Sequence, residues 1–445
     1  MGAEALAIAA HFARTRWGSA PATRDALETH QGRALRRFLR EVLPRAPMYR
    51  DRRVRDLSEL PVMDKSALMG EFDARNTRGI RLEDAMALAL RAEASRDFTP
   101  TIGDVTVGLS SGTSGNRGVF LVSAAERRRW AGILLARALP HALTPRLLTP
   151  WAPPIRVAFF LRANSNLYET LGSRRIRFAF FDLLAGVEAA LPALLALRPD
   201  VLVGTPQLLR ALAAEQRAGR LDIRPSHILS VAEVLEAQDA AAVEQAFGVR
   251  PHQLYQATEG FLGYTCAHGG LHLNERFVHI EPQWLDDAHT RFQPVVTDFT
   301  RETQLIVRYR LNDVLRLADA PCACGSPERT LAAIEGRCDE VLWLPARDSA
   351  RAVPVFPDAV RRCMALAGPA VREFEVVQQG MRWHVGLAAS PGAQVLVVRA
   401  MAELWARLGV RPPELVFGDW QAQDLHLKRR RVRLAQLPQG LSCTF

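Results

Sequence analysis

Residues 200–233 read DVLVGTPQLLRALAAEQRAGRLDIRPSHILSVAE, and this stretch decides the fold. It begins with DVLVG, a short apolar run typical of a buried strand. Residues 206–219 then show the periodicity of an amphipathic helix, with Pro206 in the first turn and Gly219 at the end. HILSVAE (227–233) predicts a further strand followed by a loop. A strand, a helix and a strand in this order predict two parallel strands joined by a crossover helix.

The same alternation extends outward along the chain. VTVGLSS (105–111) predicts a strand that enters a loop, residues 186–197 predict a helix, and PHQLYQATE (251–259) predicts a further strand and loop. We therefore expect a layered α/β fold, in which ligands bind beyond the carboxyl ends of the strands. The polar clusters SSGTSG, SVAE and YQATEG are each predicted to lie at such an end.

The pattern changes after about residue 340. VREFEVVQQGMRWHVGLAA (371–389) predicts two strands around a turn at Gln379-Gly380. Residues 394–409 predict a strand or helix start followed by a helix, and residues 413–419 a further strand. The sequence thus predicts a small α+β domain over residues 339–445, after a large α/β domain over residues 1–338 whose first 60 residues form a helical extension.

Composition restricts the class of protein. The 445 residues are 48% hydrophobic and 23% charged, which is ordinary for a soluble globular protein and excludes collagen, a disordered tail protein and a disulfide miniprotein. Apolar runs such as residues 186–197 are shorter than the about 20 residues that cross a bilayer. The N-terminus has no basic segment ahead of an apolar run, as a secretory signal would. We expect a cytoplasmic protein without a membrane partner.

The basic residues point to an anionic partner. A net charge of +10 favours nucleotides, coenzyme A or nucleic acid. Only two of the 57 basic residues are lysines, Lys65 and Lys428, so each lysine is more informative than an arginine.

Five polar motifs follow one another along the chain. The first is SSGTSGNRG (110–118), whose glycines allow close backbone approach and whose hydroxyls and N–H groups can surround a phosphate. It is not a Walker A loop, because GxxxxGK[ST] is absent, and alone it would more often be a plain connection. YQATEG (255–260), YRLND (309–313), EGRCDE (335–340) and Lys428 follow.

This order resembles the adenylate-forming superfamily of acyl- and aryl-CoA ligases, adenylation domains and luciferases. DKSALMGEFD (64–73), the CxCG ahead of IEGRCDE, and VFPDAV (355–360) are similar to its phenylacetate–CoA ligase and coenzyme F synthetase branch. The resemblance spans about residues 60 to 435. It implies an ATP-dependent, AMP-forming ligase that adenylates a carboxylic acid and passes the acyl group to a thiol. It also implies a small C-terminal domain that moves between the two half-reactions.

The resemblance implies roles for residues of the large domain. Thr258 would contact the α-phosphate and Glu259 would ligate Mg²⁺, although a carboxylate at a helix N-terminus is the plainer interpretation of Glu259. Tyr255 would pack against adenine. The adenine pocket would be bordered by Ala232 and Glu233. The ATP β- and γ-phosphates would be held by Ser110, Ser111, Thr113, Ser114 and Gly115.

Further roles fall near the C-terminal domain. Asp313 would accept hydrogen bonds from the ribose hydroxyls, unless it is only a turn aspartate. Arg337 would supply charge near the ribose and phosphate, and Asp339 would be the hinge. Lys428 would be the cation of the adenylation step, against the alternatives of a solvated basic face or a nucleic-acid patch. Lys65 is assigned a structural role.

A second constellation consists of cysteine and histidine. CAHGGLH (266–272) and CAC (322–324) supply three thiols and an imidazole, which would make a closed tetrahedral zinc site. The predicted ligands are Cys266, His272, Cys322 and Cys324; His272 is preferred to His268 because its GLHL setting is similar to that in the family. The alternative is a set of buried free thiols.

Three segments depart from the family pattern. Asn116-Arg117 stands where relatives often have Lys-Pro, so Arg117 is a candidate replacement cation. Asn312 stands where the wider superfamily has Gly and the phenylacetate branch often has Arg. PARDSARAVPVFP (345–357) lacks the glycine of the loop that receives the pantetheine arm, which makes the thioester step less firmly predicted than adenylation.

The acid and the acceptor are predicted only as classes. Residues 158–184 are expected to line the acid pocket, although their aromatic residues could equally be core. The acid is expected to be aromatic or medium-chain, and the acceptor coenzyme A or a carrier protein. A homodimer is the oligomeric state considered. The candidate pocket residues are Phe159, Phe160, Asn164, Asn166 and Tyr168.

Three other functions compete with this one. The first is an adenylating enzyme that forms an amide or ester without a thioester. The second is a basic nucleic-acid-binding protein, suggested by RRRVR (429–433), although the interleaved aromatic residues of a single-strand platform are missing. The third is a nucleotide binder without turnover. We expect a ligase, with no nucleic-acid partner.

Overall fold

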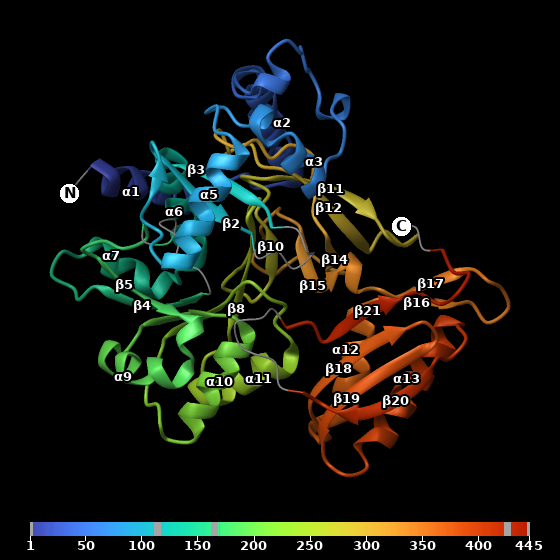
Figure 1. The fold of residues 1–445 in the computed structure, drawn as a ribbon. Coiled ribbons are helices and arrows are strands. Elements are labelled where there is room, and N and C mark those ends of the chain that lie inside the picture. Colours follow the sequence, from blue (N-terminus) through green and yellow to red (C-terminus); the bar gives the residue numbers. More distant parts are fainter. Residues whose placement is uncertain (1–2, 111–116, 162–167, 169, 422–428, 443–445) are drawn as a thin grey trace. The chain divides into compact units, whose positions relative to one another are not determined.

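The computed structural model describes residues 3–110, 117–161, 168, 170–421 and 429–442 of the chain. The chain forms two compact units (Figure 1). The first consists of Met1–Gln283, Pro294–Leu311 and Leu317–Ala332, and the second of Trp284–Gln293, Asn312–Arg316 and Ala333–Phe445. No helix in the described ranges combines the length and hydropathy that a membrane crossing needs.

A parallel sheet forms the centre of the first unit. Its order is β5 (Ile176–Asp182), β4 (Ile155–Leu161), β6 (Val201–Gly204), β7 (His227–Ser230) and β8 (His252–Ala257). The predicted strand, helix and strand of residues 200–230 are confirmed as β6, α10 (Pro206–Arg217) and β7, with β6 and β7 parallel. All residues of β6 and β7 are buried, because the sheet is covered on both faces.

Helices provide these two covering layers. Figure 1 shows α10 together with α9 (Val187–Leu197) and α11 (Ala237–Phe247) along one face, where their apolar residues form a common core with the strands. The other face packs against α6 (Ala124–Ala138), which in turn carries α1 (Ala3–Arg16). A Cβ on Gly132 of α6 would lie 2.5 Å from His11 Cβ, so this glycine lets the two helices approach closely.

Antiparallel strands flank the parallel sheet. β8 turns back into β9 (Gly260–Thr265), which pairs with β10 (Leu271–Leu273). A separate sheet is formed by β1 (Thr101–Ile102), β2 (Val105–Leu109) and β3 (Val119–Ser123). The remaining helices of four residues or more are α2 (Arg24–Glu41), α3 (Lys65–Gly70), α4 (Phe72–Arg75), α5 (Leu82–Ser95) and α7 (Thr144–Leu148).

The chain passes between the units through strands. These are β11 (His279–Trp284), β12 (Arg291–Thr297), β14 (Asp313–Leu317) and β15 (Thr330–Arg337), whereas β13 (Tyr309–Arg310) lies within the first unit and pairs with β12. In the second unit, β16 (Leu342–Pro345) and β17 (Ala352–Val355) form a hairpin.

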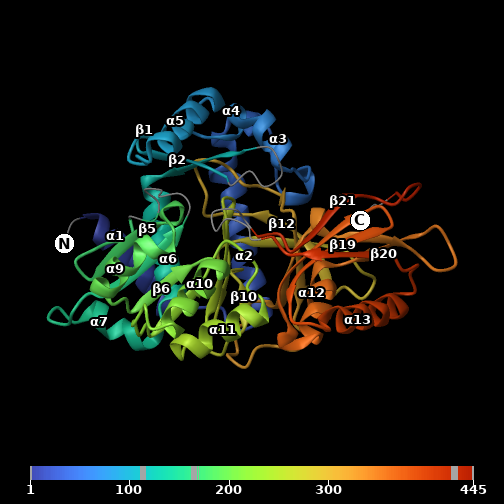
Figure 2. The same ribbon diagram turned by 60° about the horizontal axis from the view of Figure 1, so that its bottom comes forward.

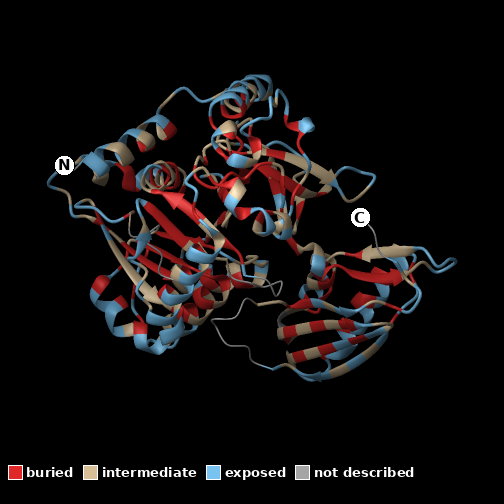
Figure 3. Cartoon of the chain, turned by 45° about the horizontal axis from the view of Figure 1, so that its top comes forward, coloured by how far each residue is buried: buried red, intermediate tan, exposed pale blue. Residues whose placement is uncertain are grey.

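The second unit is built on a four-stranded sheet. The order is β20 (Glu414–Asp419), β19 (Arg382–Ala389), β18 (Val371–Gln379) and β21 (Val432–Gln436). Buried and exposed residues alternate along β18 and β19 (Figure 3), because one face of the sheet is covered. The predicted turn between them is confirmed, with Gly380 at φ +62°.

Two helices cover that face. Figure 2 shows α12 (Pro357–Leu366) and α13 (Ala393–Leu408) side by side, and their apolar residues share one core with the sheet. The strand alternative for the start of residues 394–409 is wrong, because α13 is helical from Ala393 onward. Val397, Met401 and Leu404 recur at helical spacing and are buried, so packing outweighs the β-branched character of QVLVV.

Candidate nucleotide site and metal centre

The predicted phosphate loop closes the β2–β3 hairpin. Leu109 pairs with Val119, and beyond this pair the Ser110 N–H donates to the Gly118 carbonyl at 2.8 Å. The Gly118 N–H donates to Ser110 Oγ at 2.9 Å. These two bonds define the neck of the loop. The other predicted phosphate residues, Ser111, Thr113, Ser114 and Gly115, lie outside the described residues, so their contacts stay predictions.

Lys65 reaches the neck of this loop. Its Nζ donates to Ser110 Oγ at 3.0 Å. A Cβ on Gly118 would lie 2.8 Å from Lys65 Cε, so the glycine leaves room for the lysine. Lys65 is the first residue of α3, whose N-terminus is capped by the Asp64 carboxylate. Sequence reasoning assigned Lys65 only a structural role; the scarcity of lysine in this chain was the signal that could have identified it.

Arg117 is held elsewhere. Its guanidinium forms an ion pair with Glu93 of α5. The position of Arg117 therefore favours Lys65 over Arg117 as the cation beside the loop.

The predicted magnesium ligand lies in a tight turn. Thr258 and Glu259 join β8 to β9, and the flanking Ala257 and Gly260 are paired. The Thr258 hydroxyl donates to Glu259 Oε2 at 2.9 Å, which fixes the direction of the carboxylate. The alternative that Glu259 caps a helix is wrong, because both neighbouring elements are strands. A Cβ on Gly260 would lie 3.0 Å from Asp298 Oδ2, so the strand passes close to a buried aspartate.

The predicted adenine residues lie at two neighbouring strands. After β7 the chain makes a tight turn in which the Glu233 N–H donates to the Val231 carbonyl at 2.9 Å. Ala232 adopts φ +69°, a left-handed conformation that costs free energy in a residue other than glycine. Tyr255 is buried in β8, which is parallel to β7. Ala232 and Glu233 therefore lie in the turn after β7, and Tyr255 lies in the neighbouring parallel strand.

Aromatic rings gather near the expected acid pocket. Tyr168 packs against Phe159 at 4.6 Å and against Trp130 of α6 at 5.5 Å between ring centroids, and burial raises the pKa of Tyr168 to about 12. Phe160 points to the opposite face of β4, where it stacks on Phe181 in the leucine core, and is therefore a core residue. The candidates Asn164 and Asn166 lie outside the described residues.

The ribose and hinge residues belong to the second unit. Asp313 opens β14 and so is not a simple turn aspartate. The predicted hinge Asp339 lies in the 3₁₀ turn Cys338–Glu340 and has three partners. Asn312 Nδ2 donates to Asp339 Oδ1 at 2.8 Å, and Arg430 donates to Oδ2 at 3.0 Å. Arg337 Nε lies 3.4 Å from Oδ1.

Lys428 lies outside the described residues, but the arginines after it do not. Arg429 and Arg431 pair with Glu373 at 2.8 and 3.0 Å, and Arg430 pairs with Asp339. Arg431 is only 2% exposed. These pairs weigh against the nucleic-acid alternative, because the guanidinium groups of these three arginines already form ion pairs within the second unit.

Three cysteines and one histidine come together in the first unit. The ligand atoms of Cys266, His272, Cys322 and Cys324 all lie within 4.8 Å of one another. The Cys266 and Cys322 sulfurs are 3.6 Å apart, and Cys324 Sγ lies 3.2 Å from His272 Nε2. Tetrahedral zinc, with bonds of about 2.0–2.3 Å, places its ligand atoms roughly 3.3–3.8 Å apart. The donor set therefore fits zinc.

Neighbouring groups orient these ligands. His272 Nδ1 lies 3.1 Å from the Glu328 carbonyl, so an Nδ1–H donor leaves the Nε2 lone pair facing the sulfurs. A Cβ on Gly270 would lie 2.6 Å from Cys322 Sγ, so only glycine fits there. His268 is exposed and does not belong to the cluster, which decides between the two histidines.

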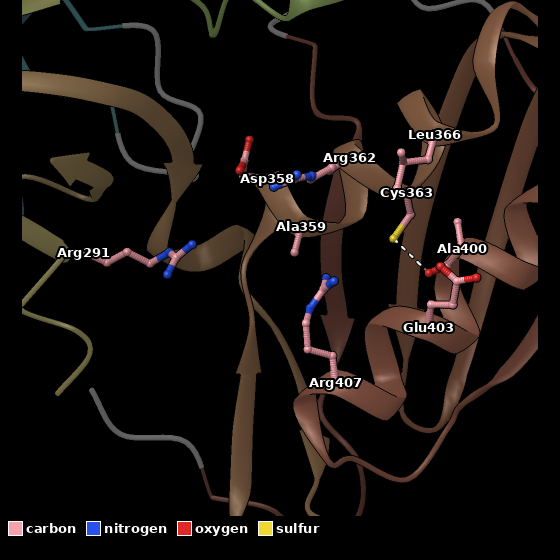
Figure 4. A pocket seen from close by; sticks show the side chains of 9 residues that line it. All are labelled: Arg291, Asp358, Ala359, Arg362, Cys363, Leu366, Ala400, Glu403 and Arg407. Carbon is pink, nitrogen blue, oxygen red and sulfur yellow. Dashed lines mark hydrogen bonds between the residues drawn. The ribbon is translucent and has the colours of Figure 1, made fainter. Parts of the chain in front are cut away.

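A surface cavity of about 440 Å³ lies in the second unit (Figure 4). Side chains of α12 and α13 form most of its wall, and none of the predicted site residues lines it. The lining residues are Arg291, Asp358, Ala359, Arg362, Cys363, Leu366, Ala400, Glu403 and Arg407.

Comparisons with known proteins find structural relatives. No family model matches the sequence, and no curated protein matches it significantly. The structure is similar to 2-hydroxyisobutyryl-CoA ligase in its postadenylation state with R3-HIB-AMP, with a TM-score of 0.63, 16% identity, and coverage of 95% of this chain and 91% of that chain.

Two other solved structures cover less of the chain. The amide bond synthetase McbA from Marinactinospora thermotolerans has a TM-score of 0.52 at 14% identity, over 73% of this chain and 68% of that one. The anthranilate CoA ligase AuaEII in complex with anthranoyl-AMP has a TM-score of 0.50 at 15% identity, over 72% of this chain and 64% of that one.

Similarity at these identities shows the fold. The predicted fold class is confirmed, because the chain forms a large α/β unit and a small α+β unit, and the similarity to 2-hydroxyisobutyryl-CoA ligase covers 95% of the chain. The chain therefore has the fold of the adenylate-forming acyl- and aryl-CoA ligases.

Proposed function

We propose that this chain is an ATP-dependent, AMP-forming carboxylate ligase that makes an acyl or aryl adenylate. The observation that carries the proposal is the similarity, over 95% of the chain, to a ligase solved with its acyl adenylate. The order of polar motifs also supports it, because each described motif lies at the end of a strand of this fold, namely β2, β8, β13 or β15.

The chemistry assigns a task to each group. A substrate carboxylate oxygen attacks the α-phosphorus of ATP, the bond to the bridging oxygen breaks, and pyrophosphate leaves. Ser110 and Lys65, whose side chains are hydrogen-bonded to each other, would hold the departing phosphates. Thr258 would contact the α-phosphate. Mg²⁺ bound by Glu259 would neutralise phosphate charge.

The remaining groups hold the sugar and complete the reaction. Asp313 would accept hydrogen bonds from the ribose hydroxyls, and Arg337 would add a positive charge beside them. Lys428 would stabilise the charge that builds on the α-phosphate oxygens. The acyl adenylate then reacts with a thiol, which displaces AMP and forms a thioester.

Coenzyme A is the first candidate for the thiol, and a carrier protein the second. Two of the three relatives described above are named CoA ligases, whereas the third is an amide bond synthetase. The loop between β16 and β17 lacks glycine, so an amine acceptor remains the alternative function. Product analysis with coenzyme A, an amine and a carrier protein separates these outcomes.

The acid is proposed to be aromatic. The ring cluster of Trp130, Phe159, Tyr168 and Phe178 supports this, because edge-to-face and tilted rings accept a further ring.

The cluster of Cys266, His272, Cys322 and Cys324 is proposed to hold structural zinc. Four protein ligands leave no open position, so the metal would bind no substrate. It would clamp the turn after β9 to the segment around Cys322.

Acid-dependent exchange of pyrophosphate into ATP tests the proposed function. We expect exchange with at least one aromatic acid from a broad panel of carboxylic acids. No acid-dependent exchange across the panel, with protein that binds MgATP, would instead indicate a nucleotide binder without turnover.

A further inference from the structure

Arg301 links the Thr258–Glu259 turn to strand β3. One terminal nitrogen donates to the carbonyl of Thr258 at 3.1 Å, within the turn that carries Glu259. The other donates to the carbonyl of Leu121 at 3.0 Å, in the strand that leaves the phosphate loop. A single guanidinium thus spans from the β8–β9 turn to the β2–β3 hairpin.

Bridging these two carbonyl groups with one side chain requires an arginine. Its planar fork presents two donors at a fixed separation, whereas lysine offers one point charge on a flexible chain. Arg301 is 8% exposed, and its Nε is buried without a hydrogen-bond partner among the described residues. The side chain is therefore committed to the two carbonyls rather than to solvent.

Two buried carboxyl groups flank Arg301. Burial alone would raise the pKa of Glu126, but the charge of Arg301 and hydrogen bonds from Ser123 and Thr303 bring it below the usual value. Asp298 is buried so completely that its pKa is raised, despite hydrogen bonds from Thr300 and the charge of Arg301. The guanidinium therefore has an ionised partner in Glu126 that offsets its own burial.

The segment that carries Arg301 is anchored separately. Glu126 Oε1 accepts the N–H groups of Glu302 and Thr303, at 2.6 and 2.9 Å. Arg129 of α6 donates to the Thr300 carbonyl at 2.6 Å and to Glu302 at 3.0 Å. Arg129 supports the same segment as Arg301 but has no bond to Thr258 or Leu121, which makes it a matched control.

We propose that Arg301 is a positioning residue that sets the distance and direction between the phosphate loop and the Thr258–Glu259 turn. The assignment rests on the proposed function, because it gives those two segments a common ligand, MgATP. Among the described residues, Arg301 donates hydrogen bonds to backbone carbonyls alone, so it acts through the geometry of the two segments and not on the phosphates.

The test compares Arg301→Ala, Arg301→Met and Arg301→Lys with Arg129→Met. MgATP affinity is measured by calorimetry, and pyrophosphate exchange with an active acid gives kcat and KM. We expect MgATP affinity to fall about tenfold in the Arg301 variants, as loss of a charge-assisted bond does. Turnover should fall roughly 10- to 100-fold, because small misplacements are costly. Arg129→Met should lower thermal stability but change MgATP affinity less than about twofold.

Chemical rescue separates positioning from a general structural role. Added guanidinium chloride, at concentrations that leave the protein folded, should restore MgATP affinity to Arg301→Ala, because the free ion can bridge the two carbonyls. If Arg301→Met and Arg301→Ala do not fold, the MgATP affinity of Arg301→Lys tests the proposal. Wild-type affinity in Arg301→Lys, or an equal loss in Arg129→Met, would overturn the proposal.

The readout also distinguishes this inference from the proposed function. Wild-type protein that binds MgATP but shows no exchange with any acid contradicts the ligase, and the affinities of the Arg301 variants still decide the role of Arg301. Wild-type protein that does not bind MgATP overturns both.

Discussion

The ammonium group of Lys65 is the cation that the structure adds to the proposed site. It contacts Ser110 across 45 residues of sequence, while the arginine of the loop itself pairs with Glu93. A lysine that donates to a loop hydroxyl can also donate to a phosphate bound there, because its three N–H donors rotate freely.

Lys65→Met should therefore raise the KM for MgATP at least about tenfold, the usual cost of a charged hydrogen bond. The KM for the acid should change much less. Steady-state exchange kinetics measure both constants. Arg117→Met is the control, and a larger effect in that variant than in Lys65→Met would assign the loop cation to Arg117 instead.

Burial of His227 makes stability depend on pH. Desolvation and the neighbouring His252, with ring centroids 4.9 Å apart, lower the pKa of His227 to about 4, and its Nε2–H donates to the Ala138 carbonyl at 2.9 Å. The folded state therefore binds the second proton of the His227 ring, which would make the ring positively charged, less readily than the unfolded state, in which the pKa is about 6.5. The contribution of neutral His227 to the free energy of unfolding is fully present above pH 6.5 and is lost as the pH falls toward 4.

The difference between the folded and unfolded pKa values of His227 corresponds to about 3 kcal/mol in the free energy of unfolding. Urea unfolding at pH 7 and pH 4.5 measures this loss. His227→Gln keeps an N–H donor but does not titrate, so its stability should fall less between the two pH values. An equal pH dependence in both proteins would show that other groups dominate.

At the scale of elements, the cysteine cluster joins β9 and β10 to the segment around Cys322. These parts of the chain are more than 50 residues apart, and the hydrogen bond of His272 to the Glu328 carbonyl adds a second tie. A metal there would contribute to folding directly, because the unfolded chain has no preformed site.

Purified protein should contain about one zinc ion per chain, measured by elemental analysis. His272→Ala and Cys324→Ser should lose it and unfold at a temperature lower by several degrees, since each kcal/mol shifts the midpoint by about 2–4 °C in a domain of roughly 150–250 residues. His268→Ala is the matched control and should keep the metal. Wild-type protein without near-stoichiometric zinc would contradict the assignment.

At the scale of the whole molecule, the proposed site residues are divided between the two units. The proposed phosphate residues belong to the first unit, whereas Asp313, Arg337, Asp339 and Lys428 belong to the second. Asp339 and Arg430 are paired, so the hinge turn is tied to the segment that follows Lys428.

Lys428→Ala should lower adenylation roughly 100-fold or more, the usual cost of removing one group that stabilises a developing charge. Attack of a thiol on a preformed adenylate should keep its rate, because no pyrophosphate leaves in that step. Exchange kinetics and single-turnover thiolysis measure the two steps separately. Activity retained in both would show that Lys428 is not the adenylation cation.

The local signals of the chain were enough to predict its elements. Strands β6 and β7, helix α10 and the β18–β19 turn could be predicted because periodicity, helix caps and turn glycines act within a few residues. The order of motifs likewise indicated the fold. Local pattern misled only where packing outweighed it, as at the start of α13.

Contacts between distant segments needed the folded chain. Lys65 meets Ser110, Arg117 turns away to Glu93, and Arg301 spans two hairpins. None of these pairs shares a helix turn or a strand ladder, so no short-range rule relates them. They depend on how buried layers pack, and a side chain's partner follows from that packing and not from its neighbours in sequence.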